Sequence, residues 1–197
     1  MENGEALEHM LFGGAFSALL PPDFQDVSEL REIPDNQEVF AHRHMDQSII
    51  VELLEYQEAV VDANAARYHF EDIASANDAG GQERSEVLSV EPISGEQLML
   101  AECPSAWFLT GRQLVSKFNE EARNTVNIYM CLFRLPQFAT EVLLTFNDPV
   151  VINPSSSSAE RLRPDVRSVP DQMSAWSLEH FKTLMQTLRL RDTGVFG

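Results

Sequence analysis

The stretch from residue 126 to residue 146 constrains the fold most, because it contains two long apolar segments separated only by a Pro-Gln pair. Val126 to Leu135 and Phe138 to Phe146 are rich in β-branched and aromatic residues, which favour β-strands. A connection as short as Pro136-Gln137 joins antiparallel neighbours, since a parallel pair needs a crossover of a dozen residues or more. We therefore predict a long β-hairpin here, ended by Asn147 to Pro149.

Further segments show alternating or glycine-bounded apolar residues, which is typical of short strands joined in hairpins. They are residues 11–20 with a bend at Gly13-Gly14, residues 86–93, and residues 107–110 and 113–118, which flank a predicted tight turn at Gly111-Arg112. Residues 1–9 are acidic and are expected to be mobile.

Helical periodicity replaces the strand pattern in two places. They are residues 58–76, which Ala79-Gly80-Gly81 is expected to stop, and residues 176–188, with Ser174 as the expected N-cap. A helix of one or two turns is also expected at residues 24–31, capped by Asp26 or Ser28. Because consecutive hairpins outnumber strand–helix–strand alternations, the pattern indicates an α+β fold in which helices cover an antiparallel sheet.

The length of 197 residues predicts one domain, residues 1–197, large enough to bury a core. Residues 153–172 contain four consecutive serines and three prolines, which is the composition of a flexible surface loop. We therefore predict a single domain interrupted near its end by one loop.

The stretch from Ile33 to Tyr56 gathers acidic residues around the apolar segment 49–54. Its carboxylates are Asp35, Glu38, Asp46, Glu52 and Glu55, with Glu58 adjacent. After turn residues at 34–36, Gln37 to Ala41 is expected to form a strand. Three consecutive β-branched residues favour a second strand over 48–55, whereas a Ser48 cap with apolar pairs at i,i+4 would favour a helix. We predict the strand, in which Glu52 and Glu55 point to opposite faces; in a helix they would share one.

The charge balance restricts the kinds of partner that the chain can bind. Fourteen basic and 31 acidic side chains give a formal net charge of −17. Such a field repels phosphate backbones and anionic membrane surfaces and attracts basic protein surfaces, although the charge could also provide solubility alone. The apolar run from Met10 to Leu20 is too short to span a bilayer and lacks the basic flank of a signal peptide. Cys103 and Cys131 match no metal or redox spacing, which indicates reduced thiols in a soluble cytosolic or nuclear protein.

Motifs for bond chemistry are missing from the sequence, which contains no GxxxxGK[ST], GxGxxG, GxSxG or HExxH. His42 and His44 would share a face of a strand, but no third ligand accompanies them, so solvated loop histidines are expected instead of a metal site. His69 is expected to pack or to bond within its helix. We therefore predict no catalytic residue, no metal and no cofactor, and the carboxylate cluster remains the candidate binding site.

Several fragments in a fixed order resemble the Ran guanine nucleotide release factor family. They are LFGGAF (11–16), LR-x-x-PDNQEVF (30–40), DQSIIVELLE (46–55), RYHFED (67–72), RLPQF (134–138), LLTFN (143–147) and the terminal GVFG (194–197). The resemblance spans nearly the whole chain and weakens only in the Ser/Pro stretch near residue 155.

This resemblance implies an antiparallel sheet of about six strands with helices on both faces. It also implies a non-enzymatic, monomeric protein of the nucleus and cytoplasm that binds the GTPase Ran and promotes release of its guanine nucleotide. The family's acidic pair corresponds to Glu52 and Glu55, and the resemblance places Asp35, Asn36, Glu38 and Asp46 on the same surface.

A second role is also implied, because a mammalian member assists surface delivery of a voltage-gated sodium channel. This chain would then act as a trafficking adaptor, associated with the plasma membrane through the channel. A nucleotide-release assay with Ran separates the two functions.

Overall fold

The structure, a computed structural model, describes residues 5–77, 79, 84–115, 124–151 and 175–197. Within these residues the strands form two antiparallel sheets, one of seven strands in the order β3-β4-β5-β9-β8-β7-β6 and one of three in the order β1-β2-β10. The strands are β1 (Leu7–Leu11), β2 (Phe16–Leu20), β3 (Phe24–Asp26), β4 (Gln37–His42), β5 (Ser48–Glu55), β6 (Ser85–Pro92), β7 (Ser105–Val115), β8 (Asn124–Leu135), β9 (Thr140–Val151) and β10 (Arg189–Leu190). The α-helices are α1 (Asp62–Ala76) and α3 (Leu178–Thr187), and short 3-10 turns cover Phe12–Gly14, Val27–Glu29, Gly95–Gln97, Pro136–Phe138 and Thr193–Phe196.

The predicted long hairpin is β8 and β9, which lie near the middle of the large sheet. Their pairing runs from Leu135↔Thr140 at the turn to Thr125↔Val151 at the far end. The prediction that Asn147 to Pro149 ends the hairpin is wrong, because β9 continues to Val151. A register shift next to Val126, the partner of Pro149, accommodates the proline, which cannot donate to the ladder.

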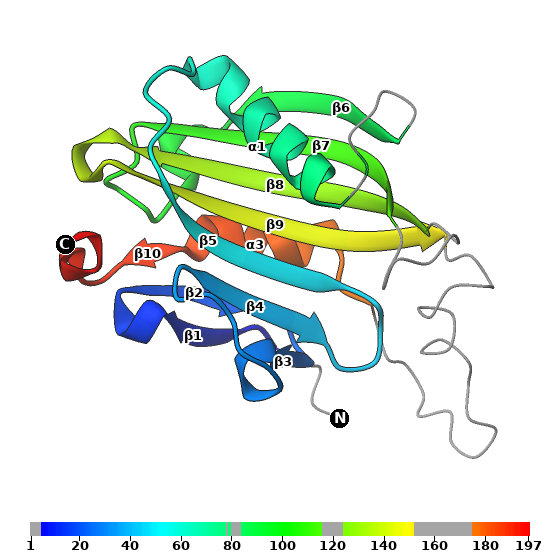
Figure 1. The fold of residues 1–197 in the computed structure, drawn as a ribbon. Helices are drawn as coiled ribbons and strands as arrows, with labels where there is room; N and C mark the ends of the chain where they lie inside the picture. Colours follow the sequence, from blue (N-terminus) through cyan, green and yellow to red (C-terminus); the bar gives the residue numbers. More distant parts are fainter. Residues whose placement is uncertain (1–4, 78, 80–83, 116–123, 152–174) are drawn as a thin grey trace.

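The two faces of the large sheet are covered by different elements (Figure 1). On one face α1 packs against alternate strand residues such as Leu132 and Leu143. On the other face α3 and the small sheet pack against the intervening residues, such as Phe133 and Leu144. Because successive side chains of a strand point to opposite faces, one hairpin supplies both apolar cores. The predicted α+β fold with helices on both faces is confirmed, with seven strands in the large sheet.

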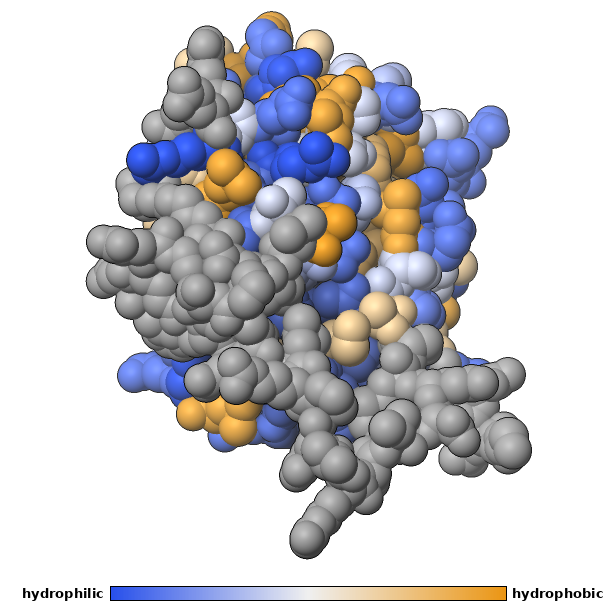
Figure 2. Space-filling model, turned by 90° about the vertical axis from the view of Figure 1, so that its right-hand side faces the viewer, coloured by the Kyte–Doolittle hydropathy of each residue, from blue (hydrophilic) through white to orange (hydrophobic). Residues whose placement is uncertain are grey.

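Exposed apolar side chains are scattered over separate elements. They are Leu7, Met10, Leu30, Val61, Tyr68, Leu88, Met99 and Val150. On the side of the molecule shown in Figure 2, hydrophilic residues predominate among the described side chains that are visible, and hydrophobic ones are interspersed. Single apolar residues of this kind are normal for a soluble protein surface.

The predicted hairpin at Gly111-Arg112 is wrong, because β7 passes through these residues without turning. Gly111 pairs with Ile128 of β8 on one side and with Val87 of β6 on the other. The glycine is needed for close approach: a Cβ placed on it would lie 2.5 Å from Cε2 of the Phe70 ring on α1. The glycine therefore provides space for helix packing, not a turn.

Replacing Gly111 with alanine is therefore expected to destabilise the fold by about 1–3 kcal/mol through overpacking. The added methyl group would also lie 3.0 Å from the Glu86 carbonyl oxygen, so a shift of the Phe70 ring alone does not relieve the crowding. Urea unfolding measures the loss, and Gly95→Ala is the matched control because no atom lies within 4 Å of its added Cβ. Equal stabilities of the two variants would contradict this role of Gly111.

Some element boundaries also differ from the predictions. Residues 24–31 form strand β3 and a single 3-10 turn, because Phe24 pairs with His42 while the Asp26 carboxylate caps the turn by accepting from the Ser28 amide. Residues 7–9, predicted to belong to a mobile end, are part of β1 and pair with β2, and residues 1–4 lie outside the described residues. The C-terminal helix begins at Leu178 and is capped by Ser177. The expected cap Ser174, the stop at Gly80-Gly81, residues 116–118 and the loop 153–172 lie outside the described residues.

Candidate functional site

Residues 48–55 form strand β5, as predicted, and not the alternative helix. The strand pairs antiparallel with β9 along its whole length and with β4 as far as Glu52, whose partner is Gln37. Leu54 packs into the core under α1, whereas Leu53 packs into the opposite core. By alternation Glu52 lies on the α1 face and Glu55 on the other face. The two carboxylates therefore leave the strand in opposite directions, as expected for a strand.

The end of β5 is a local edge of the sheet, which gives a partner access to both carboxylates. Pairing with β4 stops at Glu52, and beyond it the turn residue Asn36 takes over. The Leu53 amide donates to the Asn36 carbonyl at 2.9 Å, and the Asn36 Nδ2 group donates back to the Leu53 carbonyl at 3.1 Å. Glu55 follows with no residue of β4 beside it and is exposed. The strand is therefore open at Glu55, and Glu52 is the last residue of β5 that pairs with β4.

Glu52 is half-buried in a setting that disfavours its charged form. Burial raises the pKa of its carboxyl group above the ordinary value, and the Asp72 carboxylate on α1 adds to the rise. A hydrogen bond from Gln37 Nε2 at 3.2 Å and the charge of His69 act in the opposite direction but do not cancel the effect. Within the described residues Glu52 forms no ion pair. Among the described residues, Glu52 is therefore a carboxylate whose partners do not offset the cost of its burial.

Replacing Glu52 with glutamine is therefore expected to increase the free energy of unfolding at pH 7. A carboxyl group whose pKa is raised by folding binds its proton more tightly in the folded state, so its ionisation at higher pH costs stability. The advantage of the variant should disappear as the pH falls to 4.5, the ordinary pKa, because Glu52 is then protonated in the folded protein. Urea unfolding at pH 7 and pH 4 measures this difference, with the exposed Glu91→Gln on β6 as control. If Glu52→Gln instead lowered the free energy of unfolding at pH 7, the conclusion that the fold disfavours the charged form of Glu52 would be wrong.

The other predicted site residues divide into two groups. Asp35 and Asn36 are exposed in the turn before β4, next to the open end of β5. Glu38 lies on the opposite face from Glu52, where its Oε1 atom accepts a hydrogen bond from the Phe12 amide at 2.7 Å. Asp46 belongs to the β4–β5 connection, so it lies beyond the other end of β5, roughly 20 Å or more from Glu55 along the strand. The structure thus brings Asp35 and Asn36 to the acidic pair and separates Glu38 and Asp46 from it.

A buried charged network, which sequence reasoning missed, lies beside the same end of β5. Arg134 of β8 and Glu141 of β9 are paired across the hairpin, and their exposed fractions are 1% and 0%. The Arg134 Nε group donates to Glu141 Oε1 at 2.9 Å, and its Nη1 group donates to Asp62 Oδ1 at 2.5 Å. His69 is buried, as the packing alternative predicted, and its side chain bonds to Glu141 instead of within its own helix. The feature of the sequence that could have revealed this network is the presence of two charged residues, Arg134 and Glu141, inside an otherwise apolar hairpin.

The network also holds the segment that connects β5 to α1. Arg134 donates from Nη2 to the Gln57 carbonyl at 2.7 Å and from Nη1 to the Val60 carbonyl at 2.8 Å. Its guanidinium carbon lies 4.3 Å from the centroid of the Tyr56 ring. Glu141 accepts from the Gln57 amide at 3.2 Å. Side chains of β8 and β9 therefore satisfy the backbone of a segment that has no regular secondary structure of its own.

Glu141 remains ionised because its partners outweigh its burial. Burial alone would raise the pKa of this carboxyl group, but hydrogen bonds from His69 and the Gln57 amide, with the charges of His69 and Arg134, bring it below the ordinary 4.5. A carboxylate with a lowered pKa stabilises the fold above its unfolded pKa, and this stabilisation is lost as the pH falls through the folded value. The charge of Glu141 therefore stabilises the folded state, whereas the charge of Glu52 destabilises it.

The remaining features of the described residues do not resemble a reaction centre. No group of three or more histidine, cysteine or acidic side chains in these ranges is arranged to hold a metal ion. The prediction of a solvated loop histidine is wrong for His42, which is buried at the end of β4. Its Nδ1 atom accepts from the His44 and Met45 amides at 3.1 Å, so its ring stabilises the turn that follows. Cys103 and Cys131 are both free thiols, and burial raises the pKa of Cys103 to about 11. None of the helices described is both long enough and apolar enough to cross a membrane.

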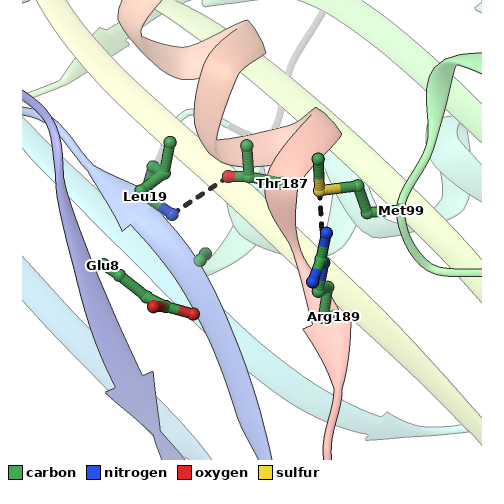
Figure 3. A pocket seen from close by; sticks show the side chains of 6 residues that line it. Glu8, Leu19, Met99, Thr187 and Arg189 are labelled. Carbon is green, nitrogen blue, oxygen red and sulfur yellow. Dashed lines mark hydrogen bonds between the residues drawn. The ribbon is translucent and has the colours of Figure 1, made fainter.

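An open hollow lies between the small sheet and the end of α3, away from β5 (Figure 3). Its polar groups are used internally: Thr187 Oγ1 accepts from the Leu19 amide at 2.9 Å, and Arg189 Nε donates to Met99 Sδ at 3.2 Å. Glu8 at its rim pairs with Arg191 at 2.7 Å. Each of these polar side chains thus has a partner within the protein, and the end of β5 remains the candidate site.

Comparisons with known proteins agree on the family of this chain. The model of the Ran-interacting Mog1 protein family matches residues 9–149, which include β5 and its acidic pair. The chain is 58% identical over 187 residues to the Ran guanine nucleotide release factor of Danio rerio, covering 95% of this chain and 98% of the relative. It is 47% identical over 188 residues to the Ran guanine nucleotide release factor of Homo sapiens, covering 95% of each.

A solved structure supports the same relationship at the level of the fold. The Saccharomyces cerevisiae Ran-binding protein Mog1p superposes with a TM-score of 0.69 at 25% sequence identity, covering 99% of this chain and 100% of that chain. Together with the match over residues 9–149 and the identities above, this places the sequence and its two-sided sheet in one group of proteins. The chain belongs to the Ran-interacting Mog1 protein family.

Proposed function

We propose that this protein binds the small GTPase Ran and promotes the release of its guanine nucleotide, in support of transport between nucleus and cytoplasm. Membership of the Mog1 family and the names of its relatives support this function. The single structural observation that carries it is the end of β5, where Glu52 forms no ion pair within the described residues and Glu55 is exposed. Acidic groups that form no ion pair in their own protein are suited to a basic surface of another protein.

The mechanism requires binding and no bond chemistry. A GTPase holds its nucleotide through backbone donors, a lysine and Mg²⁺. Carboxylates can pair with basic groups near that site or compete for the groups that hold phosphate and metal. A protein that binds the empty GTPase more tightly must weaken nucleotide binding by the same factor, because the coupling between two ligands is reciprocal. The release factor therefore acts by binding, without a catalytic residue or cofactor.

The geometry of β5 determines how Ran would approach. Glu52 and Glu55 lie on opposite faces, so a partner resting on either face alone reaches only one of them. Glu55 lies at the local edge beyond the end of β4, and the half-buried Glu52 is at the last position that β4 pairs, next to the Asn36 turn beside Leu53. We place Ran at this edge, with Asp35 and Asn36 at the rim of the interface, which puts Glu38 and Asp46 outside its centre.

Ran loaded with a fluorescent GTP analogue tests the function directly. Addition of the protein in excess should accelerate nucleotide loss, with a rate that saturates as the complex forms. An unchanged rate at saturating protein would overturn the proposal. No observation in the structure favours the sodium-channel adaptor role, which stays a prediction, and a pure adaptor would leave the release rate unaltered.

A further inference from the structure

The segment from Tyr56 to Val61 connects the acidic end of β5 to α1, and its path is set by side chains of other elements. In Figure 1 it rises from β5 to α1 at the end of the sheet where the β8–β9 turn lies. The Tyr56 amide donates to the Ala139 carbonyl of that turn at 3.0 Å. Within the segment, Val60 N donates to Gln57 O at 3.1 Å. The exposed Glu58 lies between these two residues.

Arg134 is the main anchor of this segment. Its Nε and both Nη groups are used, on Glu141, on the carbonyls of Gln57 and Val60, and on the Asp62 carboxylate. A guanidinium presents its donors in a fixed planar fork, so these acceptors must lie in one arrangement to be satisfied together. Glu141 completes the anchor by accepting the Gln57 amide. The residues on both sides of Glu58 are thus held from the interior of the sheet.

Stability alone is a poor explanation for such a buried pair. Replacing a buried ion pair by apolar residues of similar volume is often neutral or stabilising, because the charges lose their hydration. What Arg134 and Glu141 do specifically is to hold the backbone of the 56–61 segment, next to the proposed Ran site, in one conformation. A preorganised loop loses less conformational freedom on binding, which raises affinity without any new contact.

We propose that Arg134 and Glu141 are positioning residues for the binding of Ran. They act through the 56–61 segment, which fixes the end of β5 and presents Glu55 together with Glu58 in one conformation. Neither residue touches the partner, since both are buried. This inference rests on the proposed function and adds to it a set of residues inside the sheet that determine affinity.

The test is a double-mutant cycle on Ran affinity. Arg134→Lys keeps the charge but loses the planar fork, and Glu141→Gln keeps the shape but loses the charge. Each is combined with Glu55→Ala, and affinity is measured at a temperature at which urea unfolding shows every variant to be folded. Arg112→Lys is the matched control, because this arginine of β7 is exposed and its Nε group donates to Asn127 Oδ1 on β8.

We expect each positioning variant to weaken Ran binding about tenfold in the natural background and about twofold or less in the Glu55→Ala background, since interacting residues are not additive. Amide hydrogen exchange at Gln57 and Val60 should accelerate, while exchange in β7 should not. Equal losses in both backgrounds would show a merely structural role and overturn the inference. Should Arg134→Lys fail to fold, the Glu141→Gln cycle decides alone.

Failure of the proposed function gives a different result from failure of the inference. If the unmodified protein does not bind Ran, the function itself is wrong. If it binds Ran and Glu55→Ala has no effect, Ran contacts another surface and the positioning role is overturned while Ran binding stands. If the losses of affinity from a positioning variant and from Glu55→Ala are additive, Ran binding and the contact of Glu55 stand, and only the positioning role is overturned.

Discussion

Reversing the charge of both Glu52 and Glu55 to lysine is expected to lower the affinity for Ran at least about hundredfold and to abolish accelerated nucleotide release. Close charge pairs at protein interfaces couple by about 1.5–7 kcal/mol, and about 1.4 kcal/mol is a factor of ten, so the loss of two pairs gives this lower bound. Placing lysines against a basic partner adds repulsion. The fold should persist, because Glu55 is exposed and Glu52 forms no ion pair within the described residues.

The control for this prediction is a double variant with the same change in net charge on another part of the surface. Glu91 at the end of β6 and Glu96 in the 3-10 turn that follows it are both exposed, and β6 is the opposite edge strand of the large sheet. Glu91→Lys with Glu96→Lys should reduce only the long-range attraction, a modest effect that salt screens. Similar losses of affinity in the two double variants would mean that Ran responds to the overall charge of the protein and not to the carboxylates at the end of β5. Circular dichroism verifies that both variants are folded.

Replacing Arg134 with methionine is expected to cost about 3–5 kcal/mol of unfolding free energy, because it leaves Glu141 buried and charged without its guanidinium partner. The carbonyls of Gln57 and Val60 lose their donors at the same time. Urea unfolding at pH 7 measures the loss. The deficit should shrink below pH 4.5, because the wild-type protein loses the contribution of Glu141 there while the carboxyl group of the variant becomes neutral.

A double variant separates the cost of an unpaired charge from the cost of lost packing. Arg134→Met with Glu141→Leu removes both charges and should recover most of the stability, since no ion is then buried alone. We expect the same protein to remain weak in Ran binding, because the 56–61 segment has lost its anchors. A deficit below about 1 kcal/mol for Arg134→Met would contradict the burial and pairing of Glu141 described above.

The elements that the sequence predicted well are those with local causes. The β8–β9 hairpin follows from two apolar strands and a short connection, and β5 follows from three consecutive β-branched residues. Gly111 shows the limit of this reasoning. A glycine in a strand pattern indicates either a turn or a close approach of another element, and the choice depends on the Phe70 ring, which comes from α1. Only the assembled fold shows which applies.

The candidate site was predictable only in part for the same reason. Strand alternation placed Glu52 and Glu55 on opposite faces, but the choice of these two carboxylates among the six came from the family resemblance. The open end of β5 depends on where β4 begins to pair, and the network depends on contacts between residues 72 and 74 positions apart. Such contacts leave no periodic signal, so Arg134 and Glu141 read as ordinary members of their strands.

The central claim is that this protein makes the nucleotide-free state of Ran easier to reach. The most direct measurement is its equilibrium affinity for nucleotide-free Ran compared with its affinity for nucleotide-loaded Ran. We predict tighter binding to the empty form by about tenfold or more, with the difference largely lost in the variant carrying lysine at positions 52 and 55. Equal affinity for the two forms would contradict the claim, because a ligand that binds both states equally shifts neither.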